Sequence, residues 1–569
     1  MVNQIADKKL SIHQNSVSYA NKLILHTDIF DNKENKTAVS NDRKNISYNQ
    51  YESLLEDCKI SNQFEKKRDE RKKPETKTGN KFGDLYKTIK KTDFHKNEDI
   101  SKIIEKRLKG IAKKIVKEHK DQNLEVNDMF FVNVIIKAYK EYILFDVDAG
   151  KWLWWTGKQW KYDNESIVYG FCMKTIYELK EYLKADTKFG QDVSALQAYG
   201  NHRAVRSVMN MLKTRCQCHT TDFDNSKHLL NVSNGTVNLI TKKLQKHNPN
   251  DKITKIVNVD FRENEVGKKF RKFVLEISNH DEELAEYLQT LYGYSITGET
   301  REQCIFLESG NGANGKSTLN SVINEIMEDY VDTVSFDLFK RGSGGYASGP
   351  SPELAKLPAK RLVFCSETST APLNEAKIKE ITGGEKITAR ALYSDPFTYL
   401  PQFTLVFETN SKPTINGADF GIWRRIIVIP FLCKFKKNPS LKDELLQEQE
   451  AILNWLIEGA YRYYKNGLPK CRAVKTATER YMEAEDTVGA FVKYCLKDDK
   501  DSRCRAKDMY VAYERFCNEE CRTPLNIKEF KRGMEAKGYT GKRVNSGMMW
   551  LGVRLKNCVA AEMMLKIVS

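Results

Sequence analysis

The sequence predicts an α/β domain with a phosphate-binding loop (P-loop), preceded by an α+β domain and followed by a winged-helix-like domain. Three observations support this prediction. Apolar strands and helices alternate from Lys268 to about Tyr464, a glycine-rich loop joins one such strand to a helix, and the last part of the chain has the pattern of three helices and a hairpin. With a basic arm at the start, the expected parts are 1–120, 121–262, 263–470 and 471–569.

Composition narrows the possible partners. The formal net charge of the 569 residues is +17, which favours a polyanion, either nucleic acid or an acidic membrane surface. The longest apolar runs, such as Ile426–Leu432, are far shorter than the about 20 residues of a spanning helix, so no membrane partner is expected. The start of the chain lacks a secretory signal, and the thirteen cysteines are scattered and odd in number. We therefore expect a cytoplasmic protein.

Residues 1–120 are polar and have little apolar periodicity. The stretch Lys66–Lys91 is strongly basic and contains Pro74 and Gly79. This composition predicts a mostly disordered arm, which could be a solvated tail or could contact nucleic acid. Within the arm, Ile100–Lys117 has the pattern of a short basic helix.

The composition changes near Phe130. Helical spacing up to Leu144 is followed by short strand-like segments, two further helical segments and a hairpin signal at Asn234-Gly235. These features predict the α+β accessory domain. Four tryptophans could stack nucleic-acid bases, but the core of a small sheet is the favoured interpretation of Trp152, Trp154, Trp155 and Trp160.

The segment Gly310–Ser317 matches the P-loop pattern G-x-x-x-x-G-K-[ST]. It lies between an apolar strand, 303–309, and a helical segment, 318–327. In this arrangement the backbone N–H groups point at phosphates, at the positive end of the helix dipole. We expect ATP and Mg²⁺ as cofactors, with Lys316 near the β- and γ-phosphates and Ser317 on the metal. The expected nucleotide contacts are Gly310, Asn311, Gly312, Ala313, Asn314, Gly315, Lys316, Ser317 and Thr318.

A P-loop ATPase also needs an acid on a neighbouring strand. The apolar run 361–367 ends in Ser366-Glu367. Many motors have two adjacent acids at this point, whereas this chain has Ser366 in the place of the first. Glu367 would therefore have to do both tasks, holding the metal and activating the attacking water. A solvated glutamate at an ordinary strand end is the alternative.

Two further polar elements follow buried strands. Asn410 lies just beyond the strand 403–407 and could orient the water and sense the γ-phosphate. Arg424 and Arg425 precede the strand 426–430, where they suit an arginine finger that stabilises charge on the transferring phosphoryl group. A pair of surface arginines beside a strand is the alternative.

The last domain, within 486–556, has the pattern of three helices and a hairpin. Asn526 and Glu529 form a capping-box pattern at the start of the helix 527–537. This order suits a winged-helix DNA-binding domain. The helix carries the expected DNA contacts Lys528, Lys531 and Arg532.

Together these elements resemble a superfamily 3 helicase, most closely its poxvirus-type and phage or plasmid primase-helicase branch. The matching segments are GNGANGKST (310–318), RLVFCSET (361–368), KIKEITGGEKITARALYSDPFTYLP (377–401), LVFETNSKP (405–413) and GIWRRIIVIPF (421–431). The resemblance covers about 130–556. Upstream, FDVDAGKWLWWTGKQW and HLLNVSNGTVNL resemble the accessory domain of the family.

The resemblance implies an AAA+-type hexameric ring that hydrolyses ATP and moves 3′ to 5′ on single-stranded DNA. Asn410 matches the sensor position and Arg425 the finger position. Residues 383–400 match the hairpin that projects into the ring channel, where Lys386, Arg390 and Tyr393 are the expected DNA contacts. The expected function is a replicative DNA helicase that acts on single strands and forks, with replication proteins of the host or element as further partners.

Fuller members of the family carry a primase or an endonuclease ahead of the helicase, whereas here a polar segment precedes the accessory domain. The pair Asp146 and Asp148 could belong to a two-metal primase site, but it runs into a turn without a supporting histidine or third acid at a recognisable spacing. Cys216–His219, Cys517 and Cys521 fit structural cysteines better than a zinc site. Two alternatives remain: a primase-helicase with a degenerate polymerase, and an origin-binding initiator that uses ATP only to assemble.

Overall fold

The computed structural model describes residues 98–118, 125–184, 199, 201–342, 351–366, 369–415, 420–545 and 547–556. All of them belong to the unit Leu85–Ser569. The basic stretch Lys66–Lys91 and the rest of the arm up to residue 97 lie outside the described residues. No helix of the described part is long and apolar enough to cross a membrane.

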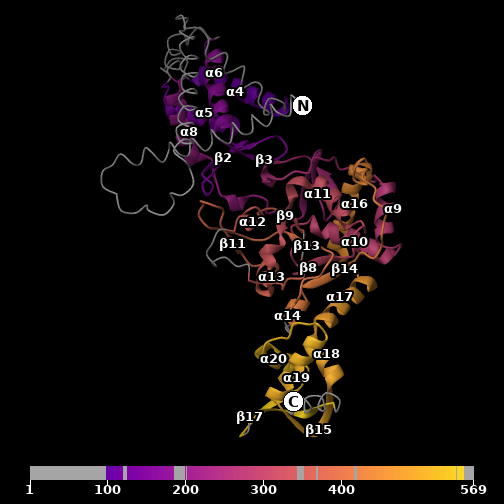
Figure 1. Cartoon of the computed structure of the whole chain (residues 1–569). Coiled ribbons are helices and arrows are strands. Elements are labelled where there is room, and N and C mark those ends of the chain that lie inside the picture. Colours follow the sequence, from indigo (N-terminus) through magenta and orange to yellow (C-terminus); the bar gives the residue numbers. More distant parts are fainter. Residues whose placement is uncertain are drawn as a thin grey trace, which may run out of the picture. The chain divides into compact units, whose positions relative to one another are not determined.

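The first core combines four helices with a four-stranded sheet of order β3-β2-β1-β4 (Figure 1). The helices are α4 (Glu98–Glu118), α5 (Asp128–Tyr139), α6 (Ser166–Lys184) and α8 (His202–Arg215). The strands are β1 (Ile143–Asp146), β2 (Lys151–Trp155), β3 (Trp160–Asp163) and β4 (Gln217–Cys218). The four tryptophans are buried in this core, as the sequence predicts. Helix α4 is the basic helix predicted within the arm, but its apolar face packs into the same core.

A second sheet is built from β5 (Leu229–Val232), β6 (Gly235–Asn238) and β7 (Lys243–Gln245), with the predicted hairpin between β5 and β6. Its apolar side chains share one hydrophobic cluster with the P-loop domain. Arg361 links this sheet to the P-loop domain. Its guanidinium donates to Leu229 O in the sheet and to Ile296 O, and it lies 4.8 Å from the ring centroid of Tyr330. The expected boundary at residue 262 therefore does not coincide with a break between cores.

The central domain is α/β with a parallel five-stranded sheet of order β14-β8-β13-β10-β9. The strands are β8 (Ile305–Ser309), β9 (Val331–Ser335), β10 (Leu362–Ser366), β13 (Thr404–Thr409) and β14 (Ile426–Pro430). Side chains alternate between the two faces, so that Phe306 joins one cluster while Ile305 and Leu307 join the other. Because the strands are parallel, their carboxyl ends meet at one edge, and the P-loop follows β8 at that edge.

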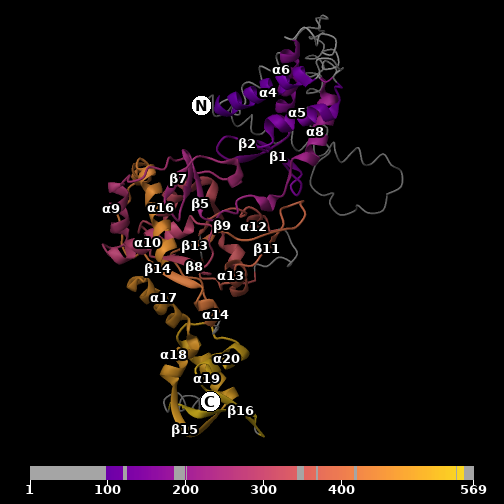
Figure 2. The same cartoon turned by 180° about the vertical axis from the view of Figure 1, so that it is seen from behind.

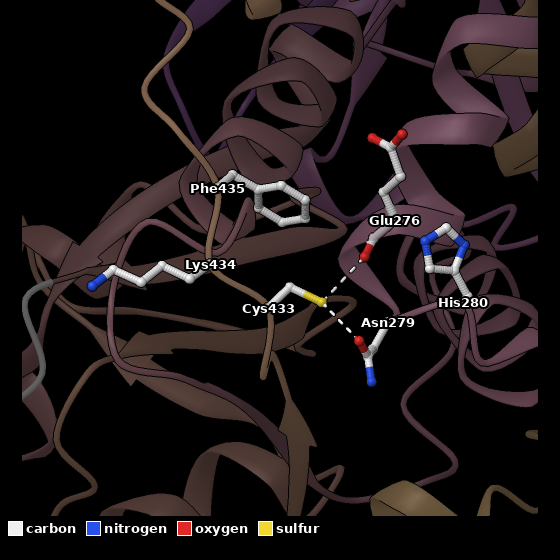
Figure 3. A pocket seen from close by; sticks show the side chains of 6 residues that line it. All are labelled: Glu276, Asn279, His280, Cys433, Lys434 and Phe435. Carbon is white, nitrogen blue, oxygen red and sulfur yellow. Dashed lines mark hydrogen bonds between the residues drawn. The ribbon is translucent and has the colours of Figure 1, made fainter.

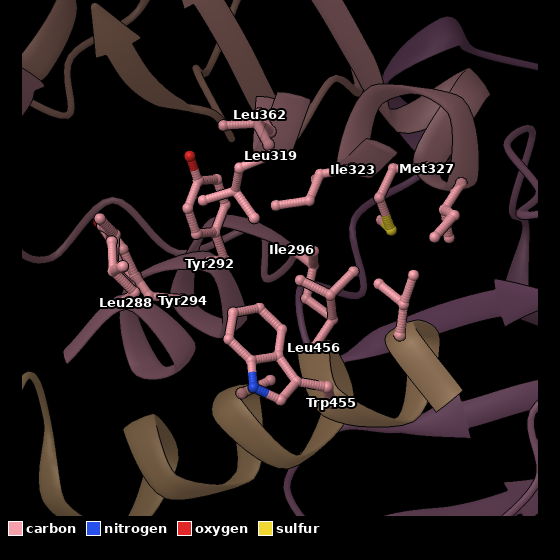
Figure 4. Packing of buried hydrophobic residues seen from close by; sticks show 14 of the residues in the cluster. Leu288, Tyr292, Tyr294, Ile296, Leu319, Ile323, Met327, Leu362, Trp455 and Leu456 are labelled. Carbon is pink, nitrogen blue, oxygen red and sulfur yellow. The ribbon is translucent and has the colours of Figure 1, made fainter. Parts of the chain in front are cut away.

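The cluster that contains Phe306 includes side chains from α9 (Lys268–Ile277), α10 (Glu282–Ser295), α11 (Lys316–Met327) and α16 (Gln449–Asn466). Helices α10 and α16 lie side by side (Figures 1 and 2). They approach so closely that a Cβ at Gly293 would lie 2.1 Å from Ala460 N, and only glycine fits there. Tyr292, Leu319 and Trp455 fill the space between these helices and the sheet (Figure 4).

A two-stranded hairpin of β11 (Ile387–Ala389) and β12 (Phe397–Tyr399) lies within the segment expected to project into a ring channel. Its tip holds Tyr393, which is fully exposed and has a φ of 59°. The hairpin predicted from the sequence is therefore present.

The last core is formed by α18 (Thr487–Cys495), β15 (Leu496–Arg505), α19 (Ala506–Glu519), α20 (Ile527–Ala536), β16 (Thr540–Val544) and β17 (Gly547–Leu555). Helix α17 (Arg472–Glu485) precedes it. Asn526 caps α20 by accepting from the backbone N–H groups of Lys528 and Glu529. The three helices and the hairpin match the prediction. Strand β15, which pairs with β17, was not predicted.

Candidate nucleotide-binding site

The P-loop connects β8 to α11, and its glycines are needed for both conformation and space. Gly312 and Gly315 have φ values of 84° and 89°, in the region that favours glycine. A Cβ at Gly310 would lie 2.2 Å from Phe431 O, and one at Gly315 would lie 2.4 Å from Ile277 Cγ2. Since the first N–H groups of a helix lack intrahelical partners, the start of α11 can bind an anion.

The structure brings Lys316 and Asn410 together. Lys316 Nζ donates to Gly310 O at 3.2 Å, to Asn314 Oδ1 at 3.1 Å and to Asn410 Oδ1 at 3.2 Å. The side chain is buried, and this burial lowers the pKa of the ammonium group, while Glu408 and Glu308 act in the opposite direction. All three partners of the ammonium are oxygens, so phosphate oxygens can take their place.

Glu408, near the end of β13, was not assigned a role from the sequence. Its carboxylate accepts a hydrogen bond from Ser317 Oγ, and its second oxygen lies 3.4 Å from Asn320 Nδ2. Glu408 is the last but one residue of β13 and Asn410 follows the strand directly, so both lie at its carboxyl end. The hydroxyl expected to bind the metal therefore already contacts a carboxylate.

Glu308 was missed as well. It is fully buried on β8, and its backbone is directly opposite that of Glu408 on the neighbouring strand. Glu308 accepts from Tyr292 Oη at 2.5 Å and from Asn320 Nδ2 at 2.7 Å. Burial, with a smaller contribution from the charge of Glu408, raises the pKa of Glu308 to about 7. An acid directly after the apolar run Ile305–Leu307 is the sequence signal that could have found it.

The acid predicted at the end of β10, Glu367, lies outside the described residues. Ser366 just before it is exposed at the end of the strand, which is next to β13 in the sheet.

The two candidate finger arginines differ in environment. Arg425 is buried, and its Nη1 donates to Gln303 O and to Thr382 Oγ1, both at 3.1 Å. Burial lowers the pKa of its guanidinium. Arg424 is exposed. The side chain of Arg425 is thus engaged within its own subunit, whereas that of Arg424 is exposed, so Arg424 becomes the second candidate for the finger.

The candidate DNA contacts all lie on the surface of the described part. Lys386, Arg390 and Tyr393 are exposed on and around the β11–β12 hairpin. The other three, Lys528, Lys531 and Arg532, are exposed on α20, whose opposite face buries Phe530 and Met534.

Several residues of the other constellations considered from the sequence make local contacts. Asp146 is buried and accepts from two backbone N–H groups of its own turn, from Tyr162 and from Thr220. His219 does approach Asp148, at 3.1 Å, but the described residues contain no group of three or more side chains that could hold a metal ion. Burial raises the pKa of the Cys216 thiol to about 11, which keeps it protonated.

The central domain is thus of the α/β class, with a glycine-rich loop at the carboxyl edge of a parallel sheet. A family model described as "D5 N terminal like" matches residues 132–279, and the model of a family of unknown function matches residues 307–425. The chain is therefore related to the D5-type primase-helicases, which confirms the resemblance seen in the motifs.

Individual relatives agree with this assignment. A protein of Acanthamoeba polyphaga mimivirus named as a helicase is 30% identical over 310 residues, which cover 50% of this chain and 32% of the relative. Primase D5 of fowlpox virus is 30% identical over 176 residues, 29% of this chain and 22% of the relative. An African swine fever virus protein named as a primase is 23% identical over 335 residues, 54% of this chain and 34% of the relative. The matches thus span at most about a third of these relatives.

Among solved structures, the C-terminal region of NrS-1 aligns with 75% of this chain and 99% of its own length, at 10% identity and a TM-score of 0.39.

Proposed function

We propose that the chain is an ATP-dependent DNA helicase of replication, in which ATP hydrolysis in the central domain drives movement along single-stranded DNA. The contacts of Lys316 with Asn410 and of Ser317 with Glu408, made where the strand ends meet, carry the proposal. The relationship to D5-type primase-helicases supports DNA as the substrate.

The P-loop, the start of α11 and Glu408 would bind different parts of the magnesium–triphosphate group. The start of α11 and Lys316 hold the phosphate oxygens by hydrogen bonds and charge. A serine hydroxyl and a carboxylate are oxygen ligands of the kind that Mg²⁺ prefers, so Ser317 and Glu408 fit a bound magnesium ion. When bound, the ion would neutralise charge on the β- and γ-phosphates.

The remaining residues position the reaction. Asn410 orients the attacking water, as a polar side chain at the strand end beside the γ-phosphate can do. Asn320 connects the two acids, because its amide contacts both Glu308 and Glu408. Glu367 keeps its proposed role as the base, and Arg424 stabilises the transferring phosphoryl group from a neighbouring subunit of a hexameric ring.

The test is the ATPase rate of the whole chain with and without single-stranded DNA, with strand displacement and the mass of the ATP-bound assembly measured on the same sample. The proposal requires DNA-stimulated hydrolysis, unwinding and a ring-sized mass. Lys316→Ala, which removes the phosphate-binding ammonium, should abolish hydrolysis and unwinding. ATP-induced assembly without hydrolysis would instead support an initiator that uses ATP only to assemble.

A further inference from the structure

A cavity of about 460 Å³ lies beside the P-loop, between the end of α9 and the segment that follows β14 (Figure 3). Its volume is within the range of small-molecule pockets, roughly 300–1,000 Å³. The ring of Phe435 points toward the α9 side, whereas Lys434 points away from the other labelled side chains. The cavity is lined by Glu276, Asn279 and His280 on one wall and by Cys433, Lys434 and Phe435 on the other.

Both walls of the cavity are attached to the P-loop. Phe435 N donates to Ala313 O at 2.7 Å. On the other wall, Ile277 at the end of α9 packs so close to Gly315 that a side chain could not be added there. A nucleotide whose phosphates lie in the loop therefore has its nucleoside within reach of the cavity.

The order of the strands distinguishes the two ends of such a nucleotide. Strand β8, which leads into the P-loop, has β13 on one side and β14 on the other. Asn410 follows β13 and contacts Lys316, the residue type that reaches the β- and γ-phosphates in P-loop proteins. The cavity wall follows β14, on the opposite side. The terminal phosphates and the cavity thus belong to opposite ends of the ligand.

The side chains at the cavity suit a nucleobase. Asn279 and His280 have φ values of 56° and 60°, and two consecutive left-handed residues other than glycine indicate a turn held by its surroundings. The turn presents an amide and an imidazole, both of which can donate and accept hydrogen bonds. The aromatic face of Phe435 on the other wall can stack against a base.

We propose that this cavity binds the base of the nucleoside triphosphate, with Phe435 in stacking contact and with Asn279 and His280 at the polar edge of the base. This inference rests on the proposed ATPase function.

Cys433 provides a direct probe. Its thiol lies within the cavity wall, 3.3 Å from Glu276 O and 3.4 Å from Asn279 Oδ1. Alkylation of the full chain with N-ethylmaleimide, followed by mass spectrometry, should be slowed at Cys433 by ATP at ten times its Kd, roughly tenfold as expected from site occupancy. Tripolyphosphate fills the P-loop without a base and should leave the rate unchanged. Cys521, which is exposed on the last domain, is the internal control.

The outcomes separate the two proposals. Equal protection by tripolyphosphate, or no protection by ATP in a chain that hydrolyses it, would overturn the base site alone. A chain that neither binds nor hydrolyses ATP would overturn the proposed function, and the base site with it.

Kinetics of variants give a second measurement. Phe435→Ala should raise the KM for ATP roughly tenfold or more, the effect of losing one stacked base. Phe435→Trp retains an aromatic face and should restore KM to within about twofold of the natural chain. Leu432→Ala is the matched control, because Leu432 is 78% exposed and does not line the cavity. An unchanged KM in Phe435→Ala would contradict the proposal.

Discussion

Glu408 illustrates how much depends on one side chain. Ser366 stands where many P-loop motors carry the first of two acids, and the contact between Glu408 and Ser317 offers a carboxylate from the neighbouring strand instead. Because β13 lies between β8 and β10, Glu408 is closer to the P-loop strand than any residue of β10 can be.

We expect Glu408→Gln to weaken Mg²⁺-dependent ATP hydrolysis, because the amide keeps the shape of the side chain but not its charge. Activity or metal affinity should fall about 10- to 100-fold, as for other residues that support a metal site. The measurement is the ATPase rate over a range of Mg²⁺ concentrations, together with metal-free ATP binding, which should change little. Glu263→Gln, at an exposed position, is the control. An unchanged Mg²⁺ dependence would exclude this role.

Glu308 should make stability depend on pH. Folding raises the pKa of Glu308 from 4.5 to about 7, so the folded chain keeps a proton that the unfolded chain releases within this interval. This contribution to the free energy of unfolding is fully present below about pH 4.5 and lost as the pH rises through about 7. Relative to Glu308→Gln, the natural chain should lose up to about 3 kcal/mol between these values. Urea unfolding of both proteins at pH 5 and pH 8 tests this, and parallel pH profiles would contradict it.

At the scale of elements, the sequence predicted the helices, strands and turns that a few neighbouring residues specify. The strand, glycine-rich loop and helix around Gly310–Ser317, the buried strands quoted from the sequence and the hairpin at Asn234-Gly235 all have short-range signals, and each of these elements is present. Strand β15 was missed because LKDDKDSRCR has no apolar alternation and depends on pairing with β17. The contact between Glu408 and Ser317 depends on strand order, which distant packing decides.

Helix α4 leads to a prediction about truncation. On its apolar face, Ile104 and Leu108 are fully buried in the core of the accessory region. Removing residues 1–97 should leave the DNA-stimulated ATPase and the thermal unfolding of the chain nearly unchanged. Removing 1–118 should expose that core and lower its unfolding temperature by several degrees, since about 1 kcal/mol corresponds to roughly 2–8 °C. Circular dichroism melting distinguishes the two, and equal stability would contradict the placement of α4.

The β11–β12 hairpin leads to a prediction about coupling between DNA and ATP hydrolysis. Lys386, Arg390 and Tyr393 are exposed, and Tyr393 is at the tip. Cations and an aromatic ring suit a contact that follows a single strand. Alanine at all three positions should preserve basal ATPase but reduce stimulation by DNA and unwinding. The same assay on Lys475→Ala and Lys272→Ala, exposed cations on α17 and α9, controls for charge. Full unwinding by the triple variant would leave the hairpin with a structural role only.

At the scale of the whole molecule, a ring would divide each active site between two subunits. In the proposed ring, the P-loop and Glu408 would hold the nucleotide from one subunit, and an arginine would come from the next. Arg425 matches the motif, but its guanidinium donates to Gln303 O and Thr382 Oγ1 inside its own subunit. Sequence position alone cannot distinguish it from Arg424, since only packing shows which of two adjacent side chains is buried.

We therefore expect different defects in the two arginine variants. Arg424→Ala should bind ATP normally but hydrolyse it about 10³- to 10⁵-fold more slowly, the usual contribution of an arginine finger. Arg425→Ala should mainly lower stability, because it removes buried hydrogen bonds. The decisive measurement mixes subunits. Lys316→Ala and Arg424→Ala chains are each inactive alone, but in a mixed ring some interfaces pair an intact P-loop with an intact Arg424. Those interfaces should regain ATPase activity. Mixed rings that form but stay inactive would show that Arg424 does not act across the interface.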